Sequence, residues 1–412
     1  MNCFNNASVY IHIPFCASLC DYCDFFSVKI NDVNDGYIDS YLNALFTDIN
    51  YQIEYFNIKN IPTVYIGGGT PSVLGKKIKK LFDALNKIPD FKPIEFSIEA
   101  NPESITEDFL KLCKDGGVNR LSLGVQTFFE PSRVAVNRNP KRIITTEDTE
   151  GHGVINTKKI YSSVKLRVLR GKFSYYLKYK KQLELAAKYF QDNLSIDLIT
   201  GLPFQDEKVI IDDIKKVLEY KPAHISLYSL SVEDGTPLQK KIKKGSVSLP
   251  NEDKADSLWL TSRDTLINAG FEQYEVSNFA IDSKKCLHNM NYWLMNNWIG
   301  AGASASGTII DENTKTARRF TYNKDIKKYI NNPSLHSANL IELDTKTLIK
   351  DCILMGYRCK EGLDNELFCQ RFGCSIADYI PKTLERWKNK DKMLFLNSFI
   401  KNAFAELDEK SH

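Results

Sequence analysis

Three cysteines stand close together near the N-terminus, in the stretch YIHIPFCASLCDYCDFF. Three residues separate Cys16 from Cys20, and two separate Cys20 from Cys23. Thiolates at this spacing can bind three corners of a cubic iron–sulfur cluster from one loop, whereas a [4Fe–4S] cluster usually takes four protein cysteines. The alternative is structural zinc, which needs four closed ligands. No fourth cysteine lies nearby, and His12 is expected in a strand as a pocket or core residue. The stretch therefore predicts a cluster with one open iron.

Short apolar runs alternate with helical patterns over the first 235 residues. The predicted strands are residues 8–15, 63–69, 95–101, 120–126, 194–203 and 224–232. Strands that alternate with helices indicate parallel βαβ units with right-handed crossovers. Six such units predict an α/β fold, an incomplete version of the eight-fold βα barrel, whose active-site face is formed by the C-terminal ends of the strands.

Polar residues follow or end several of these predicted strands. The sequence GGGTPS (67–72) follows the second strand, where glycines permit close backbone approach. Glu99 ends the third strand and Gln126 the fourth. Asp197 lies within the fifth strand and Ser231 near the end of the sixth. Taken singly, the glycine stretch could be a plain tight turn and each acid a structural carboxylate. Taken together, these polar residues predict one shared site at the C-terminal ends of the strands.

The remaining chain divides by composition. Residues 139–176 show neither helical nor strand periodicity and carry eight Lys and Arg against three Asp and Glu. They read either as a basic arm for an anionic partner or as a surface insertion; an insertion is favoured, because it costs little closure entropy. We expect a core over 1–235 that carries this insertion, an α+β extension over 236–335, and a small, mostly helical, winged-helix-like domain over 336–412.

The composition is that of an ordinary globular protein. Hydrophobic residues make up 43% of 412 residues, and the net charge of +4 gives no case for nucleic-acid binding. The N-terminus lacks the pattern of a signal peptide, and no run of about 18 apolar residues predicts a membrane span. These features favour a cytoplasmic protein with reduced thiols. The cysteines outside the motifs are expected to be buried apolar residues: Cys113, Cys352, Cys359, Cys369 and Cys374.

The cysteine motif, with an aromatic residue before its third cysteine, resembles that of the radical S-adenosylmethionine (SAM) superfamily. The stretches YIHIPFC, GGGTPS, SIEANP, RLSLGVQTF and IDLITGLP are similar to those of the oxygen-independent coproporphyrinogen III oxidase-like family. The resemblance implies that SAM occupies the open iron and that an electron from the cluster cleaves it. By similarity, the cluster ligands are Cys16, Cys20 and Cys23. The implied SAM contacts are Tyr10, Tyr22, Gly68, Gly69, Thr70, Glu99, Gln126, Arg138, Asp197 and Ser231.

One departure from the family concerns the distance from Arg138 to Asp197. It is 59 residues here and about 25 in relatives, and the excess matches the length of the segment without periodicity. An inactive, insertion-disrupted family member is therefore one reading of the chain.

A second departure separates two functions within the family. The oxidase-type decarboxylases resemble the pattern with a further cysteine two residues after the third, where this chain has Phe25 after Asp24. The CDF form resembles the HemW-type heme chaperones, as does HNMNYW (288–293), which matches an HNxxYW motif. The resemblance implies that His288 is a heme ligand; Cys286 is an alternative ligand, and a purely structural histidine is the alternative role.

We therefore expect a heme chaperone that binds a [4Fe–4S] cluster, SAM and heme and passes heme to acceptor proteins, among them respiratory hemoproteins. An electron donor of the flavodoxin or ferredoxin type, a monomer or dimer, and peripheral membrane association through the acceptor are expected as well. The rival is an oxygen-independent coproporphyrinogen III dehydrogenase, which oxidatively decarboxylates two propionates to vinyl groups. Relatives often carry a histidine where Ser306 stands, so a contact is expected to be missing there.

Overall fold

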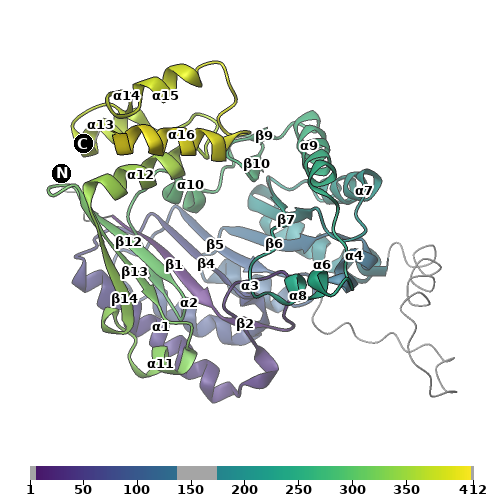
Figure 1. Cartoon of the computed structure of the whole chain (residues 1–412). Coiled ribbons are helices and arrows are strands. Elements are labelled where there is room, and N and C mark those ends of the chain that lie inside the picture. Colours follow the sequence, from purple (N-terminus) through teal and green to yellow (C-terminus); the bar gives the residue numbers. More distant parts are fainter. Residues whose placement is uncertain (1–5, 137–173, 410–412) are drawn as a thin grey trace, which may run out of the picture.

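The computed structural model describes residues 6–136 and 174–409, which are built around one twelve-stranded sheet (Figure 1). Its centre is a block of six strands: β1 (Ser8–Ile13), β4 (Thr63–Gly68), β5 (Glu95–Ala100), β6 (Arg120–Gln126), β7 (Leu194–Thr200) and β8 (His224–Ser229). They pair in parallel in this order. The six predicted strands and the partial barrel are thereby confirmed.

The extension continues this sheet at both edges. The added strands are β9 (Glu272–Gln273), β10 (Asn278–Ala280), β11 (Trp298–Ala301), β12 (Ser306–Asp311), β13 (Thr316–Tyr322) and β14 (Ala338–Leu343). Strand β11 pairs with β1 in parallel, and β12, β13 and β14 follow it antiparallel. On the other edge β10 pairs with β8, and β9 with β10. The extension is therefore continuous with the core.

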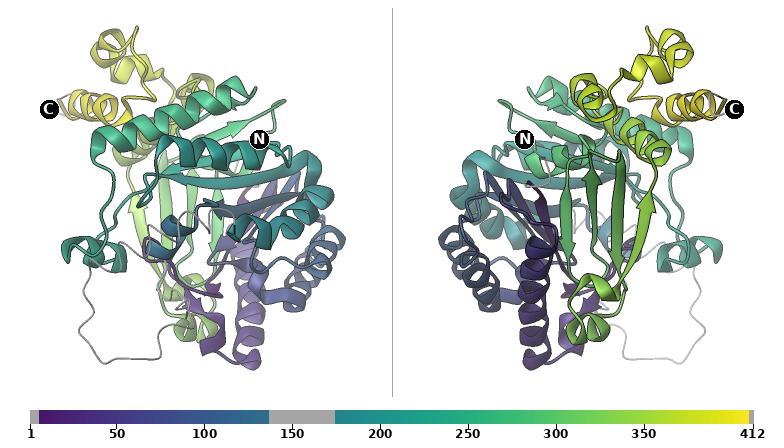
Figure 2. Two further views of the ribbon diagram at one scale, coloured as in Figure 1. Left: turned by 90° about the vertical axis from the view of Figure 1, so that its right-hand side faces the viewer. Right: turned by 90° about the vertical axis from the view of Figure 1, so that its left-hand side faces the viewer.

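Helices of the first 270 residues pack on the sheet and connect its strands (Figures 1 and 2). They are α1 (Asp35–Tyr55), α2 (Ile78–Leu85), α3 (Glu107–Asp115), α4 (Glu130–Ala135), α6 (Ser174–Phe190), α7 (Glu207–Leu218), α8 (Pro237–Lys243) and α9 (Glu252–Asn268). Short 3-10 turns cover Ile30–Asp32, Pro71–Lys77, Gln191–Asn193 and Leu335–Ser337. Local sequence sets the helix ends: Thr106 accepts the Phe109 amide at the start of α3, and Gly117 beyond its end has φ 92°.

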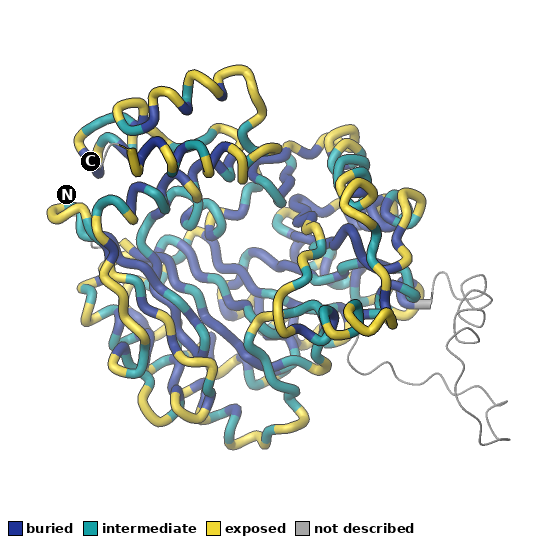
Figure 3. Tube along the Cα trace, in the orientation of Figure 1, coloured by how far each residue is buried: buried dark blue, intermediate teal, exposed yellow. Residues whose placement is uncertain are grey.

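The C-terminal part has a hydrophobic core of its own. Helices α10 (Leu287–Trp293) and α11 (Ile326–Asn331) precede it in the extension, and Ile326 and Tyr329 of α11 pack in the main core. The helices around the C-terminal core are α12 (Thr345–Gly356), α13 (Asn365–Phe372), α14 (Ile376–Tyr379), α15 (Pro381–Arg386) and α16 (Leu396–Glu409). Ile353, Phe368 and Phe399 are central to that core, and Figure 3 shows a largely exposed outer surface on these helices. Residues 345–409 contain no strand, so the wing of a winged helix is not seen there. No helix in the described ranges is long and apolar enough to cross a membrane.

The two helices that flank the predicted insertion, α4 and α6, contact each other through their side chains. Helix α6 begins at Ser174, so the last three residues of the segment predicted as an insertion, 139–176, belong to a helix. The Arg133 guanidinium on α4 lies 3.4 Å from the centre of the Tyr175 ring, and both side chains bind the Glu103 carboxylate, at 2.7 and 2.8 Å. Arg138 and residues 139–173 lie outside the described residues.

Candidate functional site

A cavity of about 440 Å³ opens at the C-terminal ends of the parallel strands. We call it the cluster cavity. It is lined by the predicted residues Cys16, Cys20, Tyr22, Cys23, Gly68, Gly69, Thr70, Glu99, Gln126, Asp197 and Ser231. Tyr10 lies instead in an adjoining chamber. Residues far apart in the sequence meet here because parallel strands present their C-terminal ends at one edge.

The loop that carries the three cysteines is fixed from both sides. Two short strands, β2 (Phe15–Cys16) and β3 (Val28–Lys29), pair at its ends. Within the loop, the Leu238 amide on α8 donates to the Asp21 carbonyl at 3.0 Å, and Lys241 Nζ lies 2.5 Å from the Asp21 carboxylate. Sequence reasoning missed this anchor; an acidic residue between two ligand cysteines, matched by a lysine-rich helix, is the signal that could have found it.

The donor set fits a cluster better than a single ion. Burial raises the pKa of all three thiols, that of Cys23 to about 12, so a metal must displace their protons. Within the described ranges, no three His, Cys, Asp or Glu side chains are grouped as they would be around one metal ion. A cubic cluster does not require that, since each thiolate binds a different iron. His12 donates from Nε2 to the Phe26 carbonyl at 2.9 Å and accepts from Tyr10, so neither ring nitrogen is left for a metal.

The glycine turn after β4 forms a close cradle beside Cys16. A Cβ on Gly69 would lie 2.7 Å from the Phe15 carbonyl oxygen and 3.0 Å from Cys16 Sγ, so only glycine leaves this space open. The amides of Gly69 and Thr70 donate to the carbonyls of Ile13 and Phe15, both at 2.8 Å. Because both backbone N–H groups already donate to protein carbonyls, neither is free to donate to a ligand.

Two acids lie deep in the cluster cavity. Glu99 accepts from Tyr65 Oη at 2.9 Å and from the Gly68 amide at 3.1 Å; burial, and then the nearby Asp197, raises its pKa to about 7. Asp197 accepts from Ser122 Oγ at 3.0 Å, and burial raises its pKa too. Two buried acids with raised pKa values favour a cationic ligand, because a nearby positive charge stabilises carboxylates. Beside them Gln126 has φ 66°, an unfavourable backbone for a non-glycine residue, of the kind often found at functional sites.

Toward the starts of the strands lies a second cavity of about 280 Å³, the inner chamber. Its wall includes Tyr10, Tyr65, Arg120, His224, His288 and Tyr292. It shares Phe25, Gly68, Glu99, Ser122 and Tyr228 with the cluster cavity, so the two adjoin. At their junction Phe25 is 67% exposed and Tyr228 42% exposed. The residue that distinguishes the CDF sequence thus stands between the two cavities.

His288 is held in one tautomer in the wall of the inner chamber. Thr63 donates its hydroxyl hydrogen to Ser8 at 2.8 Å, so its oxygen accepts from His288 Nδ1–H at 2.7 Å. Nε2 is then unprotonated and accepts from Tyr292 Oη at 2.9 Å. Burial lowers the pKa of His288 to about 3, which keeps the ring neutral. A fixed Nδ1–H with a lone pair on Nε2 is the usual arrangement of a metal-binding histidine.

The aromatic residues of the HNxxYW motif do not form a pair. The Tyr292 ring packs edge-on against His288, with centroids 5.0 Å apart. Trp293 instead lies against the Arg358 guanidinium, at 4.7 Å.

Ser306 lines neither cavity, and its hydroxyl binds Thr321 at 2.8 Å. The position at which relatives often have a histidine therefore lines neither cavity.

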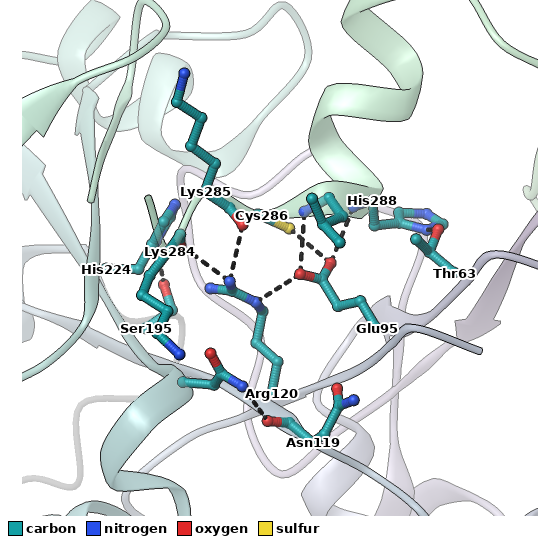
Figure 4. Close-up of polar contacts among 12 residues, drawn as sticks. Thr63, Glu95, Asn119, Arg120, Ser195, His224, Lys284, Lys285, Cys286 and His288 are labelled. Atoms are coloured by element: carbon teal, nitrogen blue, oxygen red, sulfur yellow. Dashed lines mark hydrogen bonds and ion pairs between the residues drawn. The ribbon is translucent and has the colours of Figure 1, made fainter. Parts of the chain in front are cut away.

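A buried ion pair sets the position of α10 (Figure 4). Glu95 accepts from the amides of Leu287 and His288, at 3.0 and 2.9 Å, and Arg120 Nε binds the same carboxylate at 2.8 Å. Cys286 donates to Glu95 as well, and burial raises the pKa of its thiol, so it is a protonated donor in this structure. Glu95 and Arg120 are the first residues of the buried strands β5 and β6. Opposite charges at these two positions are the sequence signal that could have predicted the pair.

The other cysteines follow expectation only in part. All cysteines in the described ranges are free thiols. Cys113, Cys352 and Cys359 are buried as predicted, whereas Cys369 and Cys374 are only half-buried, which corrects that prediction.

Comparison with known proteins agrees with this fold and identifies the family. The sequence model of the Radical SAM superfamily matches residues 10–217. The heme chaperone HemW of Lactococcus lactis is 32% identical over 94% of this chain and 90% of its own length, and that of Bacillus subtilis is 30% identical over 92% and 90%. The Escherichia coli structure described as coproporphyrinogen III oxidase (HemN), a radical SAM enzyme, superposes with a TM-score of 0.70 at 22% identity, covering 98% of this chain and 90% of that one. That likeness shows the shared fold.

The chain therefore belongs to the radical SAM superfamily and, within it, to the HemW-type family. Membership of the superfamily implies a [4Fe–4S] cluster and SAM as cofactors. The three thiols and the glycine cradle beside Cys16 fit the cluster, and the buried acids fit a cationic ligand such as SAM.

Proposed function

We propose that this protein is a heme chaperone, which holds heme beside a [4Fe–4S] cluster and SAM and delivers it to acceptor proteins, among them respiratory hemoproteins. Its HemW relatives carry the name heme chaperone. The observation that carries the proposal is the inner chamber, where a neutral imidazole with its lone pair on Nε2 adjoins the cluster cavity.

In this proposal Cys16, Cys20 and Cys23 bind the cluster, and Glu99 and Asp197 bind the positive charge of SAM. His288 binds the heme iron through Nε2, after the Tyr292 hydroxyl has moved aside. The hydrogen bond from Nδ1 to Thr63 keeps the ring oriented during this exchange. Phe25 and Tyr228 offer aromatic surface to the edge of the macrocycle at the junction of the cavities. The cluster supplies an electron to SAM when both are bound, which requires a donor such as a flavodoxin or ferredoxin.

The test is a heme titration of anaerobically cluster-loaded protein, followed by the Soret absorbance. We expect one heme per chain and at least a tenfold loss of affinity in His288→Ala, because its side chain supplies the iron ligand. His336→Ala, at an exposed histidine, is the matched control. Unchanged binding in His288→Ala would show that the iron ligand lies elsewhere, with Cys286 as the next candidate.

The rival activity is tested on the same preparation. Given coproporphyrinogen III, SAM and reductant, the chaperone forms no protoporphyrinogen. Formation of protoporphyrinogen at a catalytic rate would replace the chaperone proposal with the dehydrogenase.

The disrupted-protein reading is tested by removing residues 139–173, which leaves Arg133 and Tyr175 in place to hold α4 against α6. We expect cluster content and heme binding to be unchanged by the deletion. A gain of either on deletion would show that the segment impairs this chain.

A further inference from the structure

The floor of the inner chamber contains a guanidinium that the fold uses only in part. Arg120 is 4% exposed. Its Nε binds Glu95, and its Nη2 donates to the carbonyls of Lys284 and Lys285, at 3.0 and 2.9 Å. Nη1 has no hydrogen-bond partner among the described residues. A buried donor without a partner costs about 1–3 kcal/mol, and more when charged, so a group that accepts from Nη1 stabilises the site.

The residue that carries this nitrogen forms part of the wall of the inner chamber. Arg120, Ser195 and His224 all line the inner chamber, and the charge of Arg120 contributes, after burial, to the lowered pKa of His224. In Figure 4 the nitrogen of Arg120 that makes no contact lies toward Ser195 and His224. Arg120, which carries the unpartnered donor, is therefore part of the chamber wall.

We propose that the inner chamber binds a carboxylate of its ligand against Arg120 Nη1. The inference rests on the proposed function, in which this carboxylate is a propionate of heme. Guanidinium groups carry five N–H donors and bind carboxylates in strong, charge-assisted hydrogen bonds. Glu95 occupies only the Nε edge of Arg120, which leaves the Nη1 donors for a second acid.

The charges inside the barrel determine how this ligand is oriented between the two cavities. Glu99 and Asp197 line the cluster cavity, and Glu99 also stands where that cavity adjoins the inner chamber, so a carboxylate placed at that end would meet two acids. Arg120 lies at the opposite end, at the first residue of β6. The acid-bearing edge of the porphyrin thus points to Arg120 and its vinyl edge to Phe25 and Tyr228. The Glu95 carboxylate, which binds both Arg120 Nε and the His288 amide, fixes the iron ligand and the carboxylate site relative to each other.

The volume of the inner chamber is that expected if only part of the ligand lies inside the chamber. Sites that enclose a drug-sized ligand measure about 300–1,000 Å³, and the inner chamber holds about 280 Å³. The macrocycle therefore reaches past Phe25 and Tyr228 while its propionates remain inside.

The test compares iron protoporphyrin IX with its dimethyl ester, which lacks the acid groups. Both are titrated into cluster-loaded wild-type protein, Arg120→Lys and Arg318→Lys. Lysine keeps a positive charge for Glu95 but has no counterpart of Nη1. Arg318→Lys is the matched control, because Arg318 pairs with Glu342 on the exposed face of β13.

We expect the wild-type protein to bind the acid at least tenfold more tightly than the ester. In Arg120→Lys the ratio falls to about one through weaker binding of the acid, while Arg318→Lys keeps the wild-type ratio. Equal wild-type affinities for acid and ester overturn the carboxylate site and leave the heme proposal standing. Binding of neither porphyrin overturns both. Because the wild-type comparison needs no substitution, the result holds even where Arg120→Lys fails to fold.

Discussion

The cluster cavity lies at the C-terminal ends of the parallel strands, the inner chamber adjoins it toward the starts of the strands, and the chemistry of the two cavities differs. The cluster cavity presents three thiols on a loop and two buried acids, groups that become charged when they bind metal and cation. The inner chamber presents neutral imidazoles, hydroxyls and one guanidinium, on strands or on α10, and of the two acids it shares only Glu99. One partial barrel therefore carries two sites with different chemistry, one suited to redox cofactors and one suited to a neutral or acidic ligand, and Phe25 lies between them.

The largest expected effect lies in the cluster cavity alone. Cys20→Ala removes one of three cluster ligands, so we expect the iron bound after anaerobic reconstitution to fall to background, together with the absorbance of the cluster near 400 nm. Cys369→Ala, at a half-buried cysteine on α13, is the control and keeps the iron. Retention of full cluster iron by Cys20→Ala would contradict the assignment of the three thiols.

A second prediction concerns the cationic ligand of the same cavity. Glu99 must lose its proton to pair with SAM, and its pKa is raised to about 7. SAM binding by the wild-type protein should therefore be roughly tenfold weaker at pH 6 than at pH 8. Glu99→Gln should bind SAM at least about tenfold more weakly at pH 8, since a charged hydrogen bond contributes about 1.5–3 kcal/mol.

Calorimetric titration of the cluster-loaded protein at both pH values measures this. Glu233→Gln, at an exposed acid on the rim of the same cavity, is the control and should retain the pH dependence. A variant at Glu99 with the wild-type pH profile would remove this acid from the SAM site.

The two cavities also differ in how far the sequence predicts them. The strands and the rim residues of the cluster cavity follow from periodicity and from motifs that are local in sequence, such as Cys16 to Cys23. The inner chamber is built from residues at the starts of strands and from α10, brought together only by the closure of the sheet. Glu95 and Arg120 look like ordinary strand-edge charges in the sequence, and their pairing across 25 residues is a tertiary event. The orientation of Trp293 away from His288 could not be predicted either.

Asp48 is a buried acid that lines neither cavity, and it provides a contrast. Asp48 on α1 accepts from Tyr322 and Tyr329, at 2.5 and 2.6 Å, and burial raises its pKa to about 6. The folded state keeps this proton above the unfolded pKa of about 3.9, so the unfolded state binds fewer protons and stability falls as pH rises between these values. We expect the wild-type protein to lose about 1 kcal/mol between pH 5 and 7 that Asp48→Asn does not lose.

Urea unfolding of both proteins at the two pH values measures the difference, and the other buried acids cancel in the comparison. Parallel pH profiles would show that Asp48 is already ionised in the folded protein.

The smallest effect is expected at the hydroxyl that covers His288. Tyr292→Phe removes the hydrogen bond to Nε2, which contributes about 0.5–1.5 kcal/mol, so heme affinity should rise by a few-fold at most. Tyr65→Phe changes another hydroxyl of the inner chamber, bound to Glu99, and should leave heme affinity unchanged. Weaker heme binding in Tyr292→Phe would instead make the phenol itself a heme contact.

The separation of the two cavities is tested most directly by heme stoichiometry in two complementary variants. One replaces Cys16, Cys20 and Cys23 together by alanine; the other, Asn289→Trp, fills the inner chamber from α10, with the exposed Asn268→Trp as its control. We expect one heme per chain in the cysteine variant, and loss of heme with retention of the cluster in Asn289→Trp. Loss of heme from the cysteine variant together with full heme binding by Asn289→Trp would contradict this separation.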